Sequence, residues 1–184
     1  VLTVLKKLSN RHGETPKIVA VFGNEEYMGY EHTYIERYPE IQWINDEYVV
    51  LHINNGRLCI VGSRGVLAKP TLWQRKNIPG IENIYRARLK KIIEGLSACK
   101  DYNISLLVTH YAPLYTTVYG EPTNLYEFLG YPILDVVDDN TRPHISIHGH
   151  AHNAVKVRAF VKKTAVYNVA LPATKQITVI SLTT

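Results

Sequence analysis

Three short apolar runs along the chain have the composition of strands that a sheet buries on both faces. They span residues 18–22, 104–108 and 144–147. Each run is followed by polar residues that can bind a ligand: Asn24 follows the first, His110 the second, and a cluster of three histidines the third. Because ligand sites in α/β sheets lie at the carboxyl ends of strands, the pattern predicts a site at these three positions.

Other hydrophobic patterns predict helices. The spacing of apolar residues near the start predicts an amphipathic helix over residues 1–12, closed by Gly13. A stripe with spacings of three and four predicts a longer helix through residues 85–99. Pro132 suits the first turn of a third helix that runs to about residue 140. Residues 31–46 have no clear period, and we expect them to cross the sheet with a short helix.

The remaining pattern predicts strands, turns and loops. Asn55-Gly56 is a strong two-residue hairpin signal between β-branched residues 48–53 and the apolar run 58–61. Alternation over 155–161 predicts an outer antiparallel strand, with further strands at 165–169 and 177–182. Glycine and proline predict a long basic and aromatic loop over residues 62–80. Residues 111–131 carry five tyrosines, and either an ordered rim beside the site or a partner surface fits them.

Composition indicates one globular domain over residues 1–184. The chain is 46% hydrophobic and 20% charged, and no apolar run approaches the ~20 residues that a membrane span needs. We therefore expect no membrane partner. Cys59 and Cys99 stand singly in apolar segments, which favours buried free thiols and a reducing, cytoplasmic location.

The formal net charge of +5 mildly favours anionic partners such as phosphates or nucleic acid. The densest basic cluster lies on the predicted long helix, and we interpret it as one solvated helix face. It consists of Arg86, Arg88, Lys90 and Lys91. Together with Trp73, Arg75 and Lys76 it raises a nuclease hypothesis, which a steep salt dependence of nucleic-acid binding would support.

Three alternating histidines, His148, His150 and His152, are hard to explain by packing. Imidazole binds divalent transition metals, and Gly149 is expected to turn the backbone so that neighbouring rings converge. With the amide of Asn24, such ligands suit Mn, Fe, Zn or Co better than Ca.

These residues resemble the motifs of a known family. Gly23-Asn24-Glu25-Glu26, Thr109-His110 and Gly149-His150-Ala151-His152 are similar to the third, fourth and fifth motifs of the calcineurin-like metallophosphoesterases, in the right order. The resemblance implies an α/β fold, a four-layer α-β-β-α sandwich of two mixed sheets.

The resemblance also implies a site and an activity. Asn24, His110 and His150 would bind one metal ion and His152 a second, while His148 would orient a ligand or pack in its strand. The implied cofactors are two divalent transition metal ions, and the implied activity is hydrolysis of phosphomono- or phosphodiesters by a metal-activated hydroxide. The expected substrate is a small phosphate ester or a nucleotide.

Two departures from the family pattern bear on activity. The family's first two motifs, Asp-x-His and Gly-Asp-x-x-Asp, are not in this sequence. We expect an N-terminally truncated domain whose missing βαβ portion lies upstream. Glu25 also stands where the family usually has a histidine, which makes it the candidate catalytic acid, provided that burial raises its pKa.

A rival hypothesis assumes the same fold but no catalytic activity. The missing carboxylates and Glu25 favour a non-catalytic scaffold that binds a partner protein through residues 111–131. If the upstream strands are absent from the protein itself, exposed sheet edges invite pairing between chains and thus a homo-oligomer.

Overall fold

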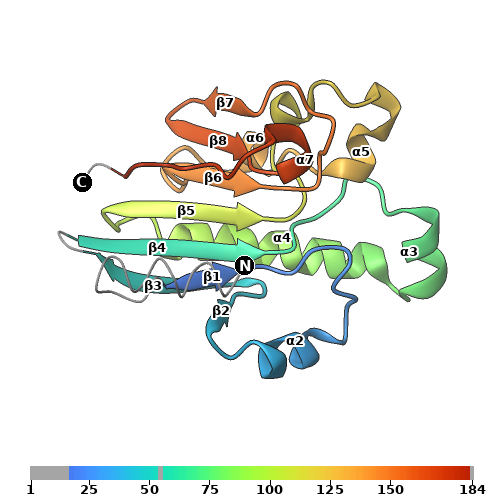
Figure 1. Cartoon of the computed structure of the whole chain (residues 1–184), viewed down its shortest axis with the longest axis horizontal. Coiled ribbons are helices and arrows are strands. Elements are labelled where there is room, and N and C mark those ends of the chain that lie inside the picture. The colour runs from blue at the N-terminus through green and yellow to red at the C-terminus, as the bar shows by residue number, and fades with distance from the viewer. Residues whose placement is uncertain (1–16, 54–55, 183–184) are drawn as a thin grey trace.

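The computed structural model of the chain describes residues 17–53 and 56–182, so the helix expected over residues 1–12 lies outside the described residues. Within these ranges the strands form two sheets, a larger one in the order β3-β4-β5-β6-β8-β7 and a smaller one of β1 and β2 (Figure 1). The strands are β1 (Ile18–Ala20), β2 (Ile41–Trp43), β3 (Glu47–Ile53), β4 (Gly56–Ser63), β5 (Ile104–Thr109), β6 (Ile145–His148), β7 (Arg158–Val161) and β8 (Thr164–Asn168).

The larger sheet is mixed. Its four central strands, β4, β5, β6 and β8, are parallel, and their arrows point the same way in Figure 1. The outer strands β3 and β7 pair antiparallel to β4 and β8. The predicted hairpin and outer antiparallel strand are thus confirmed. Because the central strands are parallel, their carboxyl ends meet at one edge of the sheet.

Helices fill the connections between strands. The long helix expected from its apolar stripe is confirmed, and it buries Tyr85, Ile92 and Leu96. A short helix also lies within the segment that we predicted to be a loop, because Thr71 and Gln74 form a capping box at its start. The helices are α2 (Glu31–Arg37), α3 (Leu72–Asn77), α4 (Ile81–Ala98), α5 (Tyr126–Leu129), α6 (Ile133–Val136) and α7 (Leu171–Thr174), with 3-10 turns η1 (Tyr115–Val118) and η2 (Thr123–Leu125).

The elements stack in four layers. One face of the larger sheet packs against α4 through a core that includes Val61 and Leu107. The other face packs against the smaller sheet through a core that includes Ile60 and Leu106. Helix α2 contributes Tyr34, which contacts the stacked rings of Phe22 and Trp43 at the smaller sheet. The α-β-β-α sandwich expected from the sequence is confirmed.

The two sheets approach each other closely at Gly62 of β4. A Cβ atom at this position would lie 2.5 Å from the Cβ of Ile44 and 3.1 Å from Cγ1 of Val21. Such a contact is far inside van der Waals distance, so only glycine fits without moving the sheets apart.

Three predicted elements differ in the structure. The first strand is β1, three residues long and half-buried, because it pairs with β2 alone among the described residues. The helix expected over 132–140 shrinks to α6, and Val137 takes an extended backbone after it. No strand forms over residues 177–182, where Ile177 and Val179 are exposed.

The cysteine prediction is wrong. Cys59 of β4 and Cys99, which follows α4, form a disulfide with Cα atoms 5.6 Å apart. The packing of α4 on β4 brings the two residues together across 40 positions of sequence. The cysteines therefore give no argument for a reducing compartment. In the ranges that the structure describes, no helix has the length and apolar character to cross a membrane.

The interpretation of the basic helix face is also corrected. Arg88 is 5% exposed, and its Nε lies 3.0 Å from a carboxylate oxygen of Asp46. The same carboxylate accepts a hydrogen bond from Ser63 at 2.6 Å. Arg88 therefore ties α4 to the start of β3, whereas Arg86, Lys90 and Lys91 are exposed as expected.

Candidate functional site

Three predicted ligand residues come together at the carboxyl ends of the strands. Nε2 of His110 lies 2.6 Å from Oδ1 of Asn24 and 3.1 Å from Nδ1 of His150. The imidazole rings of His110 and His150 have their centroids 4.7 Å apart. Asn24, His110 and His150 are called the donor trio below.

Strand register brings the two histidines together. Thr109 at the end of β5 is the register partner of His148 at the end of β6, so the residues that follow them are neighbours. The amide of Gly149 donates a hydrogen bond of 3.2 Å to the carbonyl of His110. Asn24 reaches the site from the smaller sheet, on the loop after β1. Gly23 beside it leaves room for the His110 ring, since a Cβ there would lie 3.0 Å from that ring.

His150 itself makes the turn that we expected Gly149 to make. His150 has φ 66°, in the left-handed region that non-glycine residues seldom adopt, whereas Gly149 does not have a positive φ. The turn points the imidazole of His150 back towards His110 and against the ring of Tyr111, at 4.9 Å between centroids. Backbone strain of this kind is concentrated at functional sites.

Burial keeps both histidines of the donor trio neutral. Burial, and then the neighbouring charge of His150, lowers the pKa of His110 to about 3. Burial likewise lowers the pKa of His150. A neutral imidazole has a free nitrogen lone pair, which is the form that binds a metal ion.

His148 packs in its strand. It is 1% exposed, and its Nε2 lies 2.7 Å from the hydroxyl of Thr117. Its Nδ1 lies 2.8 Å from the carbonyl of Gly149. Both ring nitrogens are engaged inside the protein, so His148 anchors the backbone that carries His150.

Glu25 positions the amide of Asn24. The Nδ2 group of Asn24 donates a hydrogen bond of 2.7 Å to Oε1 of Glu25. With its amide nitrogen held there, Asn24 turns its oxygen towards His110. Glu25 is exposed, so the burial that we expected of a catalytic acid is not found.

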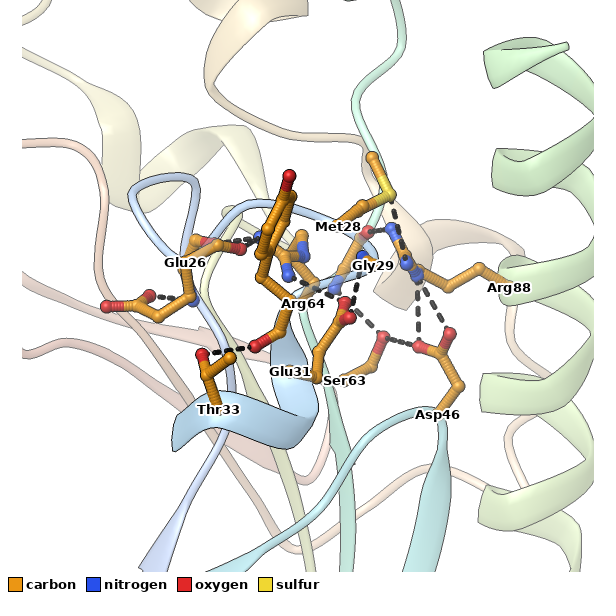
Figure 2. Close-up of polar contacts among 12 residues, drawn as sticks. Glu26, Met28, Gly29, Glu31, Thr33, Asp46, Ser63, Arg64 and Arg88 are labelled. Atoms are coloured by element: carbon orange, nitrogen blue, oxygen red, sulfur yellow. Dashed lines mark hydrogen bonds and ion pairs between the residues drawn. The ribbon is translucent and has the colours of Figure 1, made fainter. Parts of the chain in front are cut away.

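A buried arginine holds the loop that carries Asn24 and Glu25 (Figure 2). Arg64, which follows β4, is 2% exposed, and its Nη1 donates to the carbonyls of Gly23 and Glu26. Its Nη2 lies 3.3 Å from a carboxylate oxygen of Glu31. Its role in the loop depends on tertiary contacts, and no local pattern in the sequence indicates it.

A cavity of about 570 Å³ opens beside the donor trio. Asn24 and His150 form part of its wall, with Arg64 and Tyr111. Its other lining residues are Glu25, Tyr27, Met28, Tyr30, Leu67, Thr71, Trp73, Gln74, Asn77, Ile78 and Phe128. The site can therefore hold a small organic molecule next to the trio.

The donor trio fits a transition metal ion. Donor atoms bound to one such ion at about 2.0–2.2 Å lie roughly 3 Å from one another. Nε2 of His110 lies 2.6 Å from Oδ1 of Asn24 and 3.1 Å from Nδ1 of His150, which is close to that spacing. Among the described residues no group of three or more His, Cys, Asp and Glu side chains is suited to hold a metal, so the amide oxygen of Asn24 is needed as third donor. His152 is exposed, and no hydrogen bond between described side chains joins it to the trio. The structure thus brings together three of the four predicted ligands.

Comparison with known proteins supports the fold. No family model matches the chain, and no curated protein is similar to it in sequence. The phosphopantetheinyl hydrolase of Mycobacterium tuberculosis has a TM-score of 0.55 and 11% identity, over 91% of this chain and 73% of that chain. A Staphylococcus aureus protein assigned as a 5′-nucleotidase has a TM-score of 0.54 and 13% identity, over 90% of this chain and 34% of its own. The chain therefore has a metallophosphoesterase-like fold, which it shares with two hydrolases.

Proposed function

We propose that this chain is the core of a metal-dependent phosphoesterase that belongs to the calcineurin-like metallophosphoesterases. The observation that carries the proposal is the convergence of Oδ1 of Asn24, Nε2 of His110 and Nδ1 of His150 from three separate strand ends. Two neutral imidazoles and an amide oxygen suit Mn, Fe, Zn or Co. The likeness of the fold to two phosphate-ester hydrolases supports the same class of reaction.

The residues of this site have different proposed roles. Asn24, His110 and His150 would hold the first metal ion, and His152 would be a ligand of a second ion. A bound divalent ion lowers the pKa of a water molecule and neutralises charge on a phosphate ester. Glu25, which lines the cavity, fixes the direction of the Asn24 oxygen through its hydrogen bond with the Asn24 amide.

The substitution His150→Ala tests this proposal in the full-length protein. We expect the variant to lose the metal content of the wild type, measured by mass spectrometry of the metal. We also expect no metal-dependent hydrolysis of a phosphodiester or a phosphomonoester. The matched control is His52→Ala, because His52 lies exposed on the outer strand β3. Unchanged metal content and turnover in His150→Ala would overturn the proposal.

The scaffold hypothesis draws less support from the structure. Of the five tyrosines in residues 111–131, Tyr111 is buried and Tyr115, Tyr126 and Tyr131 are half-buried. Tyr119 alone among the five is exposed. A tyrosine-rich partner surface would need more of these rings on the outside.

A further inference from the structure

The cavity beside the donor trio is larger than a phosphate group needs. Its volume of about 570 Å³ lies within the range of roughly 300–1,000 Å³ in which proteins bind small organic molecules. With the phosphorus next to Asn24 and His150, most of this volume remains for the alcohol part of an ester. The chemistry of the wall therefore selects the alcohol.

The wall is aromatic and carries few charges. Five of its residues are aromatic, and Met28, Leu67 and Ile78 are aliphatic. Glu25 and Arg64 are the two Asp, Glu, Lys or Arg residues among those that line it. The aromatic residues are Tyr27, Tyr30, Trp73, Tyr111 and Phe128. The wall offers few positive charges to a polyanion, whereas a flat apolar ring can pack against several aromatic side chains.

Two of these rings already stack on each other at the cavity. Tyr27 and Trp73 have centroids 5.8 Å apart and planes inclined by 26°. They are 55% and 54% exposed, so the pair keeps a large apolar surface in contact with solvent. A third ring does not fit between them, because stacking on both sides needs about 7 Å. A ligand ring would lie on the exposed surface of the pair.

One ring of the pair lies on the loop that carries Asn24 of the donor trio, and the other lies on α3. Tyr27 lies three residues after Asn24, on the loop that Arg64 holds through the carbonyls of Gly23 and Glu26. Trp73 lies on α3, where its carbonyl accepts a hydrogen bond of 2.8 Å from the side chain of Asn77. The aromatic surface and the trio are thus parts of one site.

We propose that the substrate is a phosphate ester whose alcohol carries a planar aromatic ring, of which nucleoside phosphates are the common class. The ring stacks on the pair of Tyr27 and Trp73 while the phosphate faces the donor trio. This inference rests on the proposed phosphoesterase activity and adds its substrate class. A flexible aliphatic alcohol would use the aliphatic part of the wall and gain nothing from the stacked pair.

Two substrates that differ only in the ring test the proposal in the full-length protein. Adenosine 5′-monophosphate and ribose 5-phosphate have the same sugar phosphate, and their methyl esters serve if the enzyme cleaves diesters only. We expect kcat/KM to favour the adenosine compound by about 5- to 150-fold, the range that stacking of one base provides. Trp73→Ala should remove most of this preference, and Trp73→Phe should keep it.

The control variant is Leu72→Ala. Leu72 precedes Trp73 on α3, is 84% exposed and does not line the cavity, so the preference should stay at its wild-type value. Equal kcat/KM for the two substrates in the wild type would overturn the substrate class and leave the phosphoesterase activity standing.

Binding of adenosine, which has no phosphate, separates the two proposals. We expect calorimetry to detect adenosine binding to the wild type and to His150→Ala, and to detect none with Trp73→Ala. If the protein binds adenosine but hydrolyses no ester with Mn, Fe, Zn or Co, that result would overturn the proposed function and retain the adenosine-binding surface of Tyr27 and Trp73. No adenosine binding to the wild type would overturn the assignment of that surface.

Discussion

At the scale of single residues, Glu25 orients a ligand, and substitution can separate this role from proton donation. Its Oε1 accepts a hydrogen bond from the amide of Asn24, and its carboxyl group is exposed. Glu25→Gln keeps an oxygen acceptor for Asn24 but removes the acidic group. We expect its metal affinity to match the wild type. Its kcat on esters of aliphatic alcohols should stay close to the wild-type value, whereas loss of a general acid would lower it by about 10²–10⁴-fold.

Two comparisons make this prediction specific. A nitrophenyl ester needs no proton on its leaving oxygen, so Glu25→Gln should cleave it at close to the wild-type rate. Glu25→Ala also frees the Asn24 amide, and its metal affinity should fall, by about 10- to 100-fold for loss of a residue that orients a ligand. If Glu25→Gln loses turnover on aliphatic esters but not on the nitrophenyl ester, Glu25 also donates the proton to the leaving oxygen.

At the scale of elements, the disulfide joins β4 to the end of α4. Cys59 and Cys99 are both fully buried and close a loop of 40 residues. For a loop of this length, the chain-entropy model gives a stabilisation of about 4 kcal/mol. We expect Cys59→Ala/Cys99→Ala to lose free energy of unfolding of this order, measured by denaturant titration at neutral pH.

Thiol counting checks the same prediction independently. Unfolded, unreduced protein should react with no equivalent of a thiol reagent, and reduced protein should react with two. Two reactive thiols before reduction would show that the bond does not form and would restore the expectation from the sequence.

An element could be predicted from the sequence where its signal lies in neighbouring residues, and not where it depends on contacts between distant residues. The long helix has an apolar stripe and the hairpin has a two-residue turn signal, and both signals are local. Asn24 and His110 directly follow apolar runs. These features could therefore be predicted. The pairing of Cys59 with Cys99 depends on how α4 packs on β4, and no periodicity contains that information. The helix α3 had a local signal in Thr71 and Gln74, but the neighbouring glycines and prolines suggested a loop.

The candidate site divides in the same way. The residue types, their positions after apolar runs and their order along the chain indicated the donor trio, although Asn24 follows a strand of the smaller sheet. The role of Arg64 and the contact of His150 with His110 join residues 41 and 40 positions apart, and the positive φ of His150 has no local sequence signal. The aromatic pair of Tyr27 and Trp73 likewise joins the loop after β1 to helix α3, which only the fold brings together.

At the scale of the whole molecule, the donor trio bridges the two sheets. Asn24 follows β1 of the smaller sheet, and His110 and His150 follow β5 and β6 of the larger one. Gly62 sets the distance between the sheets, since a Cβ there would lie 2.5 Å from that of Ile44. Gly62→Ala should therefore cost about 1–3 kcal/mol of stability through overpacking. It should also weaken metal binding about 10-fold or more, although residue 62 is not a ligand.

The substitution Gly95→Ala is the matched control for this prediction. Gly95 of α4 contacts β4 at Val61, 3.1 Å from the position of an added Cβ, on the sheet face away from Ile44. The Gly95→Ala variant should therefore keep the metal affinity of the wild type.

Metal-dependent stability measures the same effect. A metal ion that bridges the sheets binds only the folded chain, so a metal concentration of 100 times its Kd should stabilise the wild type by about 2.7 kcal/mol. At that same metal concentration Gly62→Ala should gain less, because its Kd is higher, and Gly95→Ala should gain as much as the wild type. Equal gains in all three proteins would mean that the distance between the sheets does not control the metal site.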